Sequence, residues 1–149
     1  TPQDYVVGIV VFIAIVVVVV GFLPSITSPY QSGVAGEDVA QSDRVAQQLV
    51  SNLSSIQEPN RLNLTRLETV MALSESQLAS RYGLPAGTNV NLTVVSLDGT
   101  SYVTSESGDP LTSKSTFQQG SVASSARIVR LSTDDHTCEP ACRLVVRVW

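Results

Sequence analysis

The sequence predicts an α+β protein in which a long hydrophobic N-terminal helix continues into an amphipathic helix packed on a small antiparallel β-sheet. Residues 5–23 read YVVGIVVFIAIVVVVVGFL and contain no charged side chain. Apolar residues then recur at helical spacing between 39 and 56, and from Val90 the apolar period changes to two. We therefore expect a hydrophobic helix in a first domain, 1–36, and a globular head domain over 37–149.

Residues 5–23 have the length of a membrane-spanning helix. As a helix, these 19 residues extend over about 28 Å, close to the roughly 30 Å hydrocarbon core of a bilayer. Twelve of them are Val or Ile, which are mediocre helix formers in water. In lipid, however, every backbone N–H and C=O must be paired within the segment. The segment is therefore predicted to be helical.

Three roles are compatible with such a helix. A secretory signal peptide has a basic leader and is cleaved off, and a single-pass anchor is oriented by nearby basic residues. Here four residues precede the run, and the first basic residue is Arg44. We therefore expect the third role, in which the segment enters a membrane under a basic leader that is later removed and then serves an assembly.

Outside a membrane, such helices need cover from water. If a dozen side chains each contribute about 1.5–3 kcal/mol on burial, the gross gain exceeds about 20 kcal/mol per subunit. Helices of identical copies, packed at the axis of a polymer, supply that burial. The sequence therefore predicts self-association through the N-terminal helix.

With this segment, the sequence resembles the archaeal type IV pilins, particularly the pilin-like proteins of halophilic archaea. The resemblance covers about residues 1–56, and the ending CEPACRLVVRVW is also similar. It implies that a prepilin peptidase removes a leader, that the subunit first resides in cytoplasmic-membrane lipid, and that an assembly ATPase and platform build an extracellular homopolymer. The residues expected in the filament core are Thr1, Asp4, Tyr5, Val6, Ile9, Phe12, Ile13, Val16, Val20, Phe22 and Leu23.

The first residues depart from the bacterial relatives, which commonly have an aromatic first residue and a Glu at the fifth position. This chain has Thr1 and Tyr5, and Asp4 is the nearby carboxylate. One hypothesis is that Asp4 neutralises the Thr1 ammonium of an adjacent subunit, since an unpaired buried charge is very costly. The alternative is that Asp4 caps the helix start through the free N–H groups and the macrodipole.

Pro24 and Pro29 follow the apolar run. Each proline removes one helical hydrogen bond, so we expect a kink or short break near 24–33, with helix resuming at about Glu37. The apolar stripe of this second helix comprises Val39, Val45, Ala46, Leu49, Val50, Leu53 and Ile56. Pro59 is expected to end the segment.

Two short helices and a small sheet are expected in the rest of the head. Asn63 or Thr65 could begin one helix that ends at Leu73, and Ser74-x-x-Gln77 resembles a capping box for another. Val90–Val95 alternate as a strand, Asp98-Gly99 signals a hairpin into 100–105, and two more strands are expected near 126–132 and 143–149. In the last strand Leu144, Val146 and Val148 share one face, and Arg143, Arg147 and Trp149 share the other.

The two cysteines, Cys138 and Cys142, enclose a five-residue loop. For an extracellular head we predict an intramolecular disulfide. The alternative is a metal site with His136 as a third ligand, although a structural zinc normally takes four. No metal and no cofactor are therefore predicted.

Three sequons of the form N-x-[ST] begin at Asn52, Asn63 and Asn91. Because Ser and Thr make up 32 of 149 residues, chance alone accounts for about one. N-linked glycans are therefore predicted, with Asn91 on the strand face opposite Val90, Leu92 and Val94. Plain polar surface is the alternative.

Charge and motifs exclude several functions. Nine basic against 13 acidic residues leave no surplus to neutralise a nucleic acid. The nucleophile-elbow, P-loop, dinucleotide and zinc-protease motifs are absent from the sequence, so we do not expect an enzyme. The leading interpretation is the major subunit of an extracellular type IV pilus-like filament for surface adhesion or cell–cell contact. A minor pilin or single-pass surface protein is the alternative, and a membrane-tethered enzyme or a motility filament is less favoured.

Overall fold

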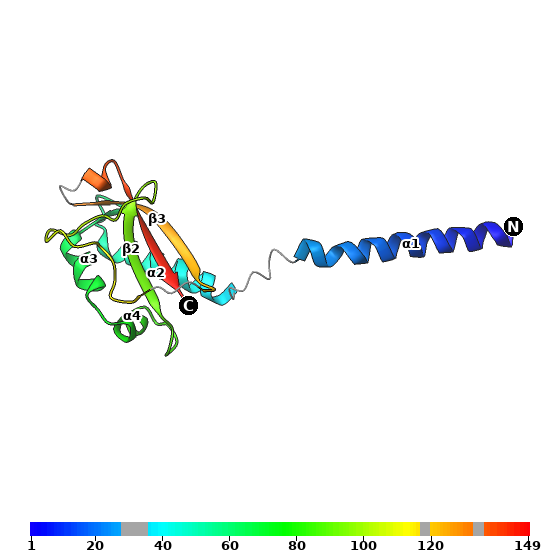
Figure 1. The fold of residues 1–149 in the computed structure, drawn as a ribbon, viewed down its shortest axis with the longest axis horizontal. Helices are drawn as coiled ribbons and strands as arrows, with labels where there is room; N and C mark the ends of the chain where they lie inside the picture. Colours follow the sequence, from blue (N-terminus) through cyan, green and yellow to red (C-terminus); the bar gives the residue numbers. More distant parts are fainter. Residues whose placement is uncertain (28–35, 117–119, 133–135) are drawn as a thin grey trace. The chain divides into compact units, whose positions relative to one another are not determined.

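The computed structural model describes residues 1–27, 36–116, 120–132 and 136–149. The chain divides into two compact units, Thr1–Gly33 and Val34–Trp149. The first unit holds the N-terminal helix, and the second is an α+β head with a small four-stranded sheet (Figure 1). Its elements are α1 (Pro2–Thr27), α2 (Gly36–Leu53), β1 (Arg61–Leu62), α3 (Leu64–Met71), α4 (Glu75–Arg81), β2 (Val90–Ser96), β3 (Ala123–Leu131), the 3₁₀ turn η2 (His136–Cys138) and β4 (Cys142–Val148).

The predicted N-terminal helix is present as α1, and it is longer than the apolar run that predicted it. It begins at Pro2, where the missing N–H of proline costs nothing in the first turn. It continues over Pro24 to Thr27, so the first part of the break predicted at 24–33 is helical. The remainder of that break, including Pro29, lies outside the described residues.

The amphipathic helix α2 begins at Gly36, one residue before its predicted start. Its buried residues are Ser42, Val45, Ala46, Leu49, Val50 and Leu53, which confirms the predicted apolar stripe from Val45 to Leu53. The prediction was wrong for Val39, which is 49% exposed. The prediction was wrong at the far end, because the helix stops at Leu53 and Ile56 is 100% exposed. The C=O of Leu53 accepts a hydrogen bond from the N–H of Asn63. The chain therefore turns back toward the sheet three residues before the predicted end.

The sheet has the order β1-β3-β4-β2 and is mixed. Three predicted antiparallel strands are present as β2, β3 and β4, and β4 is antiparallel to both of the others. The strand expected over 100–105 was wrong, because this segment makes only isolated bridges, Val95 with Tyr102 and Thr104 with Pro110. Strand β1 was not predicted, and it runs parallel to β3 with Arg61 opposite Arg130 and Leu62 opposite Leu131. A wholly antiparallel sheet was therefore the wrong expectation. The predicted turn after β2 is confirmed, since Gly99 has a φ of +80° and the N–H of Ser96 donates to Ser101.

The core lies between α2 and one face of the sheet, where α2 packs on β3 and β4. Leu144, Val146 and Val148 face this core, as their alternation predicted. The short helices α3 and α4 close the core with Leu67, Val70 and Leu78. Of the two predicted starts of α3, Asn63 is the cap, since its Oδ1 accepts from the N–H of Arg66, and the helix ends at Met71, two residues before the predicted Leu73. Ser74 and Gln77 form the predicted capping box before α4.

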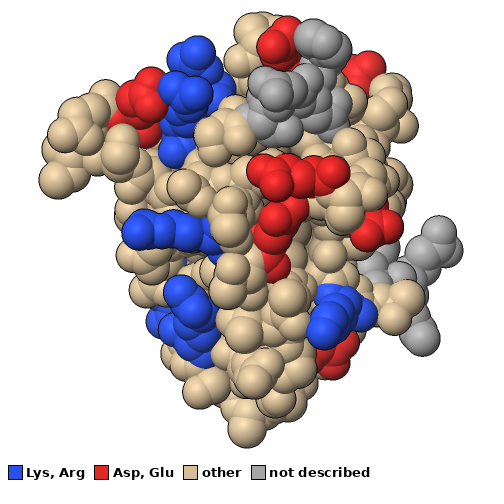
Figure 2. All heavy atoms as spheres, turned by 90° about the vertical axis from the view of Figure 1, so that its left-hand side faces the viewer, with Lys and Arg blue, Asp and Glu red and all other residues tan. Residues whose placement is uncertain are grey.

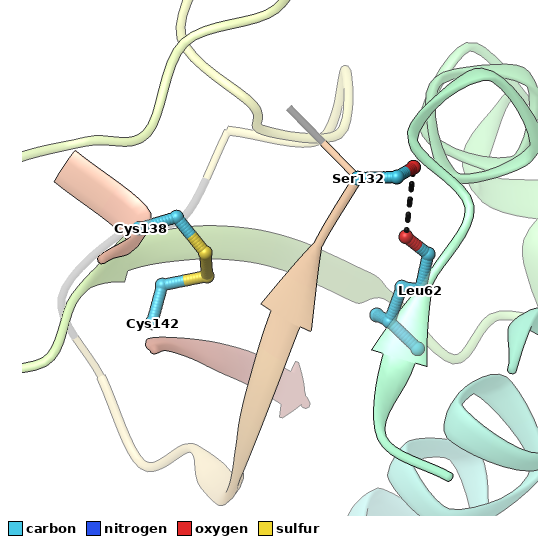
Figure 3. The surroundings of a disulfide bond; sticks show 4 residues. All are labelled: Leu62, Ser132, Cys138 and Cys142. Carbon is cyan, nitrogen blue, oxygen red and sulfur yellow. Dashed lines mark hydrogen bonds between the residues drawn. A yellow bond between two sulfur atoms is a disulfide. The ribbon is translucent and has the colours of Figure 1, made fainter. Parts of the chain in front are cut away.

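Strand β1 covers only the end of the outer edge of β3. The N–H groups of Arg130 and Ser132 donate to the C=O groups of Asn60 and Leu62, and the Ser132 hydroxyl also donates to Leu62 at 3.4 Å (Figure 3). Earlier along this edge, the guanidinium of Arg127 donates to the C=O of Ala126 at 3.2 Å. Most of the β3 edge is therefore without a neighbouring strand among the described residues.

Candidate functional site

The surface of α1 is the most unusual chemical feature of the chain. Over Pro2–Gly21 the helix is long and apolar enough to cross a membrane by its length and composition. Its large apolar side chains are between 41% exposed at Ile9 and 73% exposed at Tyr5. They cover every side of the helix, in contrast to the single stripe of α2. Among the described residues of the first unit, no other element covers these side chains.

Most of the predicted core residues lie on this exposed surface. They include Val6, Phe12, Ile13, Val16 and Val20 as well as Tyr5 and Ile9. Phe22 and Leu23 belong to the same helix, and their side chains lie outside the described part of the chain. The structure therefore gathers the described members of the predicted set on one helix, and no other element of the first unit covers them.

Asp4 interacts with Thr1 in its own chain. The Thr1 hydroxyl donates to Asp4 Oδ2 at 2.7 Å, the Thr1 amino nitrogen lies 3.6 Å from the same oxygen, and the N–H of Asp4 donates to the C=O of Thr1. Both side chains are exposed. This is the geometry of a residue that closes the first helical turn, and pairing with an adjacent subunit stays a prediction.

Cys138 and Cys142 form the predicted disulfide, which joins η2 to the start of β4 (Figure 3). Both cysteines are buried in the core of the head. The pairing overturns the alternative metal site with His136, because oxidised sulfurs are not thiolate ligands. Within the described ranges, no group of three His, Cys, Asp or Glu residues is placed to hold a metal ion.

Two of the three sequon asparagines are exposed. Asn52 lies in the last turn of α2, and Asn63 precedes α3. Asn63 caps α3 with its Oδ1 atom. A glycan would be attached to the Nδ2 atom, so it would not disturb this capping hydrogen bond. Both positions are therefore open to modification.

The expectation that Asn91 lies on a solvent-facing side of its strand was wrong. Asn91 is only 3% exposed, and its Nδ2 donates to the C=O of Ser115 at 2.9 Å. Its Oδ1 accepts from the Thr93 hydroxyl and from Arg147. The segment around Ser113 and Ser115 covers the strand face that alternation alone had assigned to solvent. A glycan on Asn91 Nδ2 would require this network to open.

The comparisons with known proteins place the chain in one family. A family model matches residues 1–149. The chain belongs to the DUF7287 family. DUF7287 is described as a family of unknown function. No curated protein and no solved structure matches the chain.

The head of this DUF7287 chain carries charges of both signs. On the face that Figure 2 draws, an acidic group lies near the centre, and acidic and basic side chains touch at the upper left and the lower right. One hollow of about 630 Å³ is lined by Arg61, Arg130, Leu131, Cys138, Glu139 and Pro140. Its cysteine is in the disulfide, so the described lining presents two arginines and one glutamate and no nucleophile paired with a base.

The sequence analysis did not predict that arginines from β1, β3 and β4 share the sheet face that points away from α2. Arg61 and Arg130 are register partners on β1 and β3, on the face opposite the buried Leu62 and Leu131. The shared face of Arg143 and Arg147 was visible in the alternation of β4. The position of Arg61 on this face was not visible in the sequence, because a strand of two residues has no recognisable alternation.

Proposed function

We propose that this DUF7287 protein is the repeating structural subunit of an extracellular type IV pilus-like filament, which assembles through α1 and serves surface adhesion or cell–cell contact. The observation that supports it is the apolar surface of α1, which is exposed on every side in the single chain. Adhesion is the use that the sequence resemblance to archaeal type IV pilins implies. The same resemblance supplies the biogenesis partners: a prepilin peptidase, and an assembly ATPase with its platform.

The physical argument concerns where α1 can reside. Lipid covers the helix fully, and its length matches a bilayer. In lipid, apolar helices gain little by contacting one another, whereas in water each buried Val or Ile contributes about 1.5–3 kcal/mol. A bundle of many copies therefore becomes stable once α1 leaves the membrane. The same helix can therefore be stable first in the membrane and later, after it leaves the membrane, in a polymer.

Two features of the head support a location outside the cell. The Cys138–Cys142 disulfide persists in oxidising surroundings and is rare in the cytosol. The exposed sequon asparagines Asn52 and Asn63 offer sites for hydrophilic glycans on the surface of an assembly. Each of these features also suits a membrane-anchored surface protein.

The second candidate function is that of a minor pilin or single-pass surface protein. The length and composition of α1 favour it, because they satisfy the requirements of a membrane span. Its head would then recognise a partner or take part in assembly without forming the bulk of a filament. The two candidates differ in abundance: a major subunit dominates the material that is sheared from cells, and a minor subunit is present there in traces.

The test is polymerisation of the purified full chain. The chain is purified in detergent, the detergent is removed by dialysis, and the product is examined by electron microscopy and by sedimentation. We expect filaments that sediment and that redissolve only in detergent or denaturant. A chain that remains monomeric in plain buffer, or that enters added vesicles and never polymerises, contradicts the proposal.

A matched pair of variants shows whether α1 carries the assembly. Ile13→Asp places a carboxylate on the exposed surface of α1, and Ile56→Asp places the same group on a fully exposed position of the head. We expect Ile13→Asp to abolish filaments, because burying an unpaired charge is very costly. Ile56→Asp should leave them unchanged. Equal behaviour of the two variants would remove α1 from the assembly.

A further inference from the structure

The face of the sheet that points away from α2 is covered at β2 by the segment around Ser113 and Ser115, whereas over β3 no described helix covers it. Because side chains alternate along a strand, the residues next to the core-facing ones point away from α2. On β3 these include Ala126, Ile128 and Arg130, all exposed, and on β4 they include Arg143 and Val145, both half-buried. Ile128 is 64% exposed and is the register partner of Arg143.

The strands bring four arginines to this face, Arg61, Arg130, Arg143 and Arg147, and none of the four strands contains an Asp or Glu. Three of them have partners: Arg61 pairs with Glu58 at 2.8 Å, Arg143 donates one N–H to the C=O of Leu97 at 3.0 Å, and Arg147 donates to Asn91 Oδ1 at 3.1 Å. Arg130 has no hydrogen bond or ion pair through its side chain with another described residue. We call Ile128, Arg130 and Arg143 the basic sheet patch. It combines an apolar centre with arginines, a composition that is enriched where proteins meet.

The start of α2 has the opposite charge. Glu37 and Asp38 lie in its first turn, followed by Val39, which is 49% exposed. Arg44, the one basic residue of α2, donates to the C=O groups of Tyr82 and Gly83 and so is directed to another part of the head. We call Glu37, Asp38 and Val39 the acidic helix patch. It also combines an exposed β-branched residue with charges of one sign.

We propose that the basic sheet patch of one copy binds the acidic helix patch of the next copy in the assembly. Arg130 and Arg143 would face Glu37 and Asp38, and Ile128 would pack against Val39. The inference rests on the proposed function, since it names the contact by which neighbouring heads recognise each other. Charge complementarity of this kind fixes register and suppresses wrong pairings.

The contact joins two different patches of the same chain, so it is heterologous. A heterologous contact leaves one free patch at each end of the array, and repeating it produces an open helical filament unless the rotation closes a ring. A self-complementary contact would instead stop at a dimer. The separate location of the two patches therefore agrees with a polymer.

The test is a charge exchange in the full chain, with the critical concentration for polymerisation measured by sedimentation after detergent removal. Arg130→Glu should raise the critical concentration about tenfold or more, because it places like charges together. Glu37→Arg should do the same. The double variant Arg130→Glu/Glu37→Arg should return to within about threefold of the wild type, because the pair is restored in reverse. Arg66→Glu, an exposed position on α3, is the matched control and should polymerise as the wild type does.

Thermal melting of the head in each variant verifies that the fold is retained. If the wild type polymerises and Arg130→Glu behaves as Arg66→Glu does, or if the double variant is as weak as the product of the two single changes, the proposed contact is wrong and the filament proposal stands. If the wild type does not polymerise at all, the proposed function fails, and this contact fails with it.

Discussion

Asp43 on α2 and Arg127 on β3 form an ion pair between the helix and the sheet, with 2.8 Å between Asp43 Oδ1 and Arg127 Nη2. The hydroxyl of Ser125 donates to the same oxygen at 2.8 Å. These two donors, the hydroxyl first and the guanidinium second, lower the pKa of Asp43 below its usual value of 3.8. The pair lies at the solvent-exposed margin of the core and joins α2 to β3.

We predict that Asp43→Ala lowers the melting temperature of the head by a few degrees at neutral pH. The substitution removes one acceptor from both Ser125 and Arg127, and the pair is solvent-exposed, so the loss is modest. Circular dichroism melting of Asp43→Ala, Arg127→Ala and the double variant measures the coupling. Strictly additive losses would show that the two side chains do not stabilise each other.

A second prediction concerns acid stability and Asp98. Hydrogen bonds from the Ser96 hydroxyl, and then from the N–H and hydroxyl of Thr100, lower the pKa of Asp98 from 3.8 to about 2. A depressed native pKa contributes stability that is complete above the unfolded value and is lost as the pH falls through the native one. We therefore expect the Asp98 contribution to disappear between pH 3.8 and about 2.

The measurement is the melting temperature between pH 5 and pH 2. Asp98→Asn should flatten this part of the wild-type profile, because an amide does not titrate there. Ser96→Ala should give an intermediate profile, since it removes the largest cause of the shift. A wild-type slope that persists unchanged in Asp98→Asn would assign the acid sensitivity to other carboxylates.

The third prediction separates the sequons by burial. Asn91→Ala should lower the free energy of unfolding by about 1–3 kcal/mol, because it leaves buried partners such as the Ser115 carbonyl without their hydrogen bonds. Asn52→Ala, at an exposed position, is the matched control and should change it by less than about 0.5 kcal/mol. Urea denaturation measures both values, and equal effects would contradict the buried network.

The same burial predicts which sequons carry glycans. In protein isolated from its native cells, Asn52→Gln and Asn63→Gln should each reduce the intact mass by one glycan, and Asn91→Gln should change it only by the substituted residue. A wild-type mass equal to that of the bare polypeptide would exclude glycosylation altogether. Loss of a glycan in Asn91→Gln alone would show that modification precedes folding of the head.

The fifth prediction concerns the disulfide. The double variant Cys138→Ala/Cys142→Ala should fold and be less stable than the wild type by under about 3 kcal/mol, because the closed loop is short. Denaturant melts with and without reductant give the difference, and the wild type without reductant should release no thiol to a titrant. Two reactive thiols in the native protein would contradict the pairing.

Much of the head could be predicted because its signals are local. The capping box of α4 needs only Ser74 and Gln77, and the turn after β2 needs only Asp98-Gly99. The apolar stripe of α2 likewise depends on spacing within one helix. Such patterns act within a few residues of one another, so the sequence displays them directly.

The failures concern contacts between distant segments. The two residues of β1 join the sheet only because the turn after Leu53 brings them alongside β3, nearly 70 positions later in the chain. The burial of Asn91 depends on Ser113 and Ser115, in a stretch whose Ser and Thr content suggests an exposed loop. Alternation in β2 predicted two faces, and only tertiary contacts decide that both are covered.

The outer margin of β3 has a consequence for crowding. Strand β1 pairs with only the last two residues of β3, and the Arg127 guanidinium donates a hydrogen bond to the C=O of Ala126 on the same edge. An exposed edge strand is a template for strand pairing with a second molecule, and charged side chains commonly prevent such pairing. At high local concentration of heads, this arrangement therefore disfavours amyloid-like pairing of the β3 edges of different molecules.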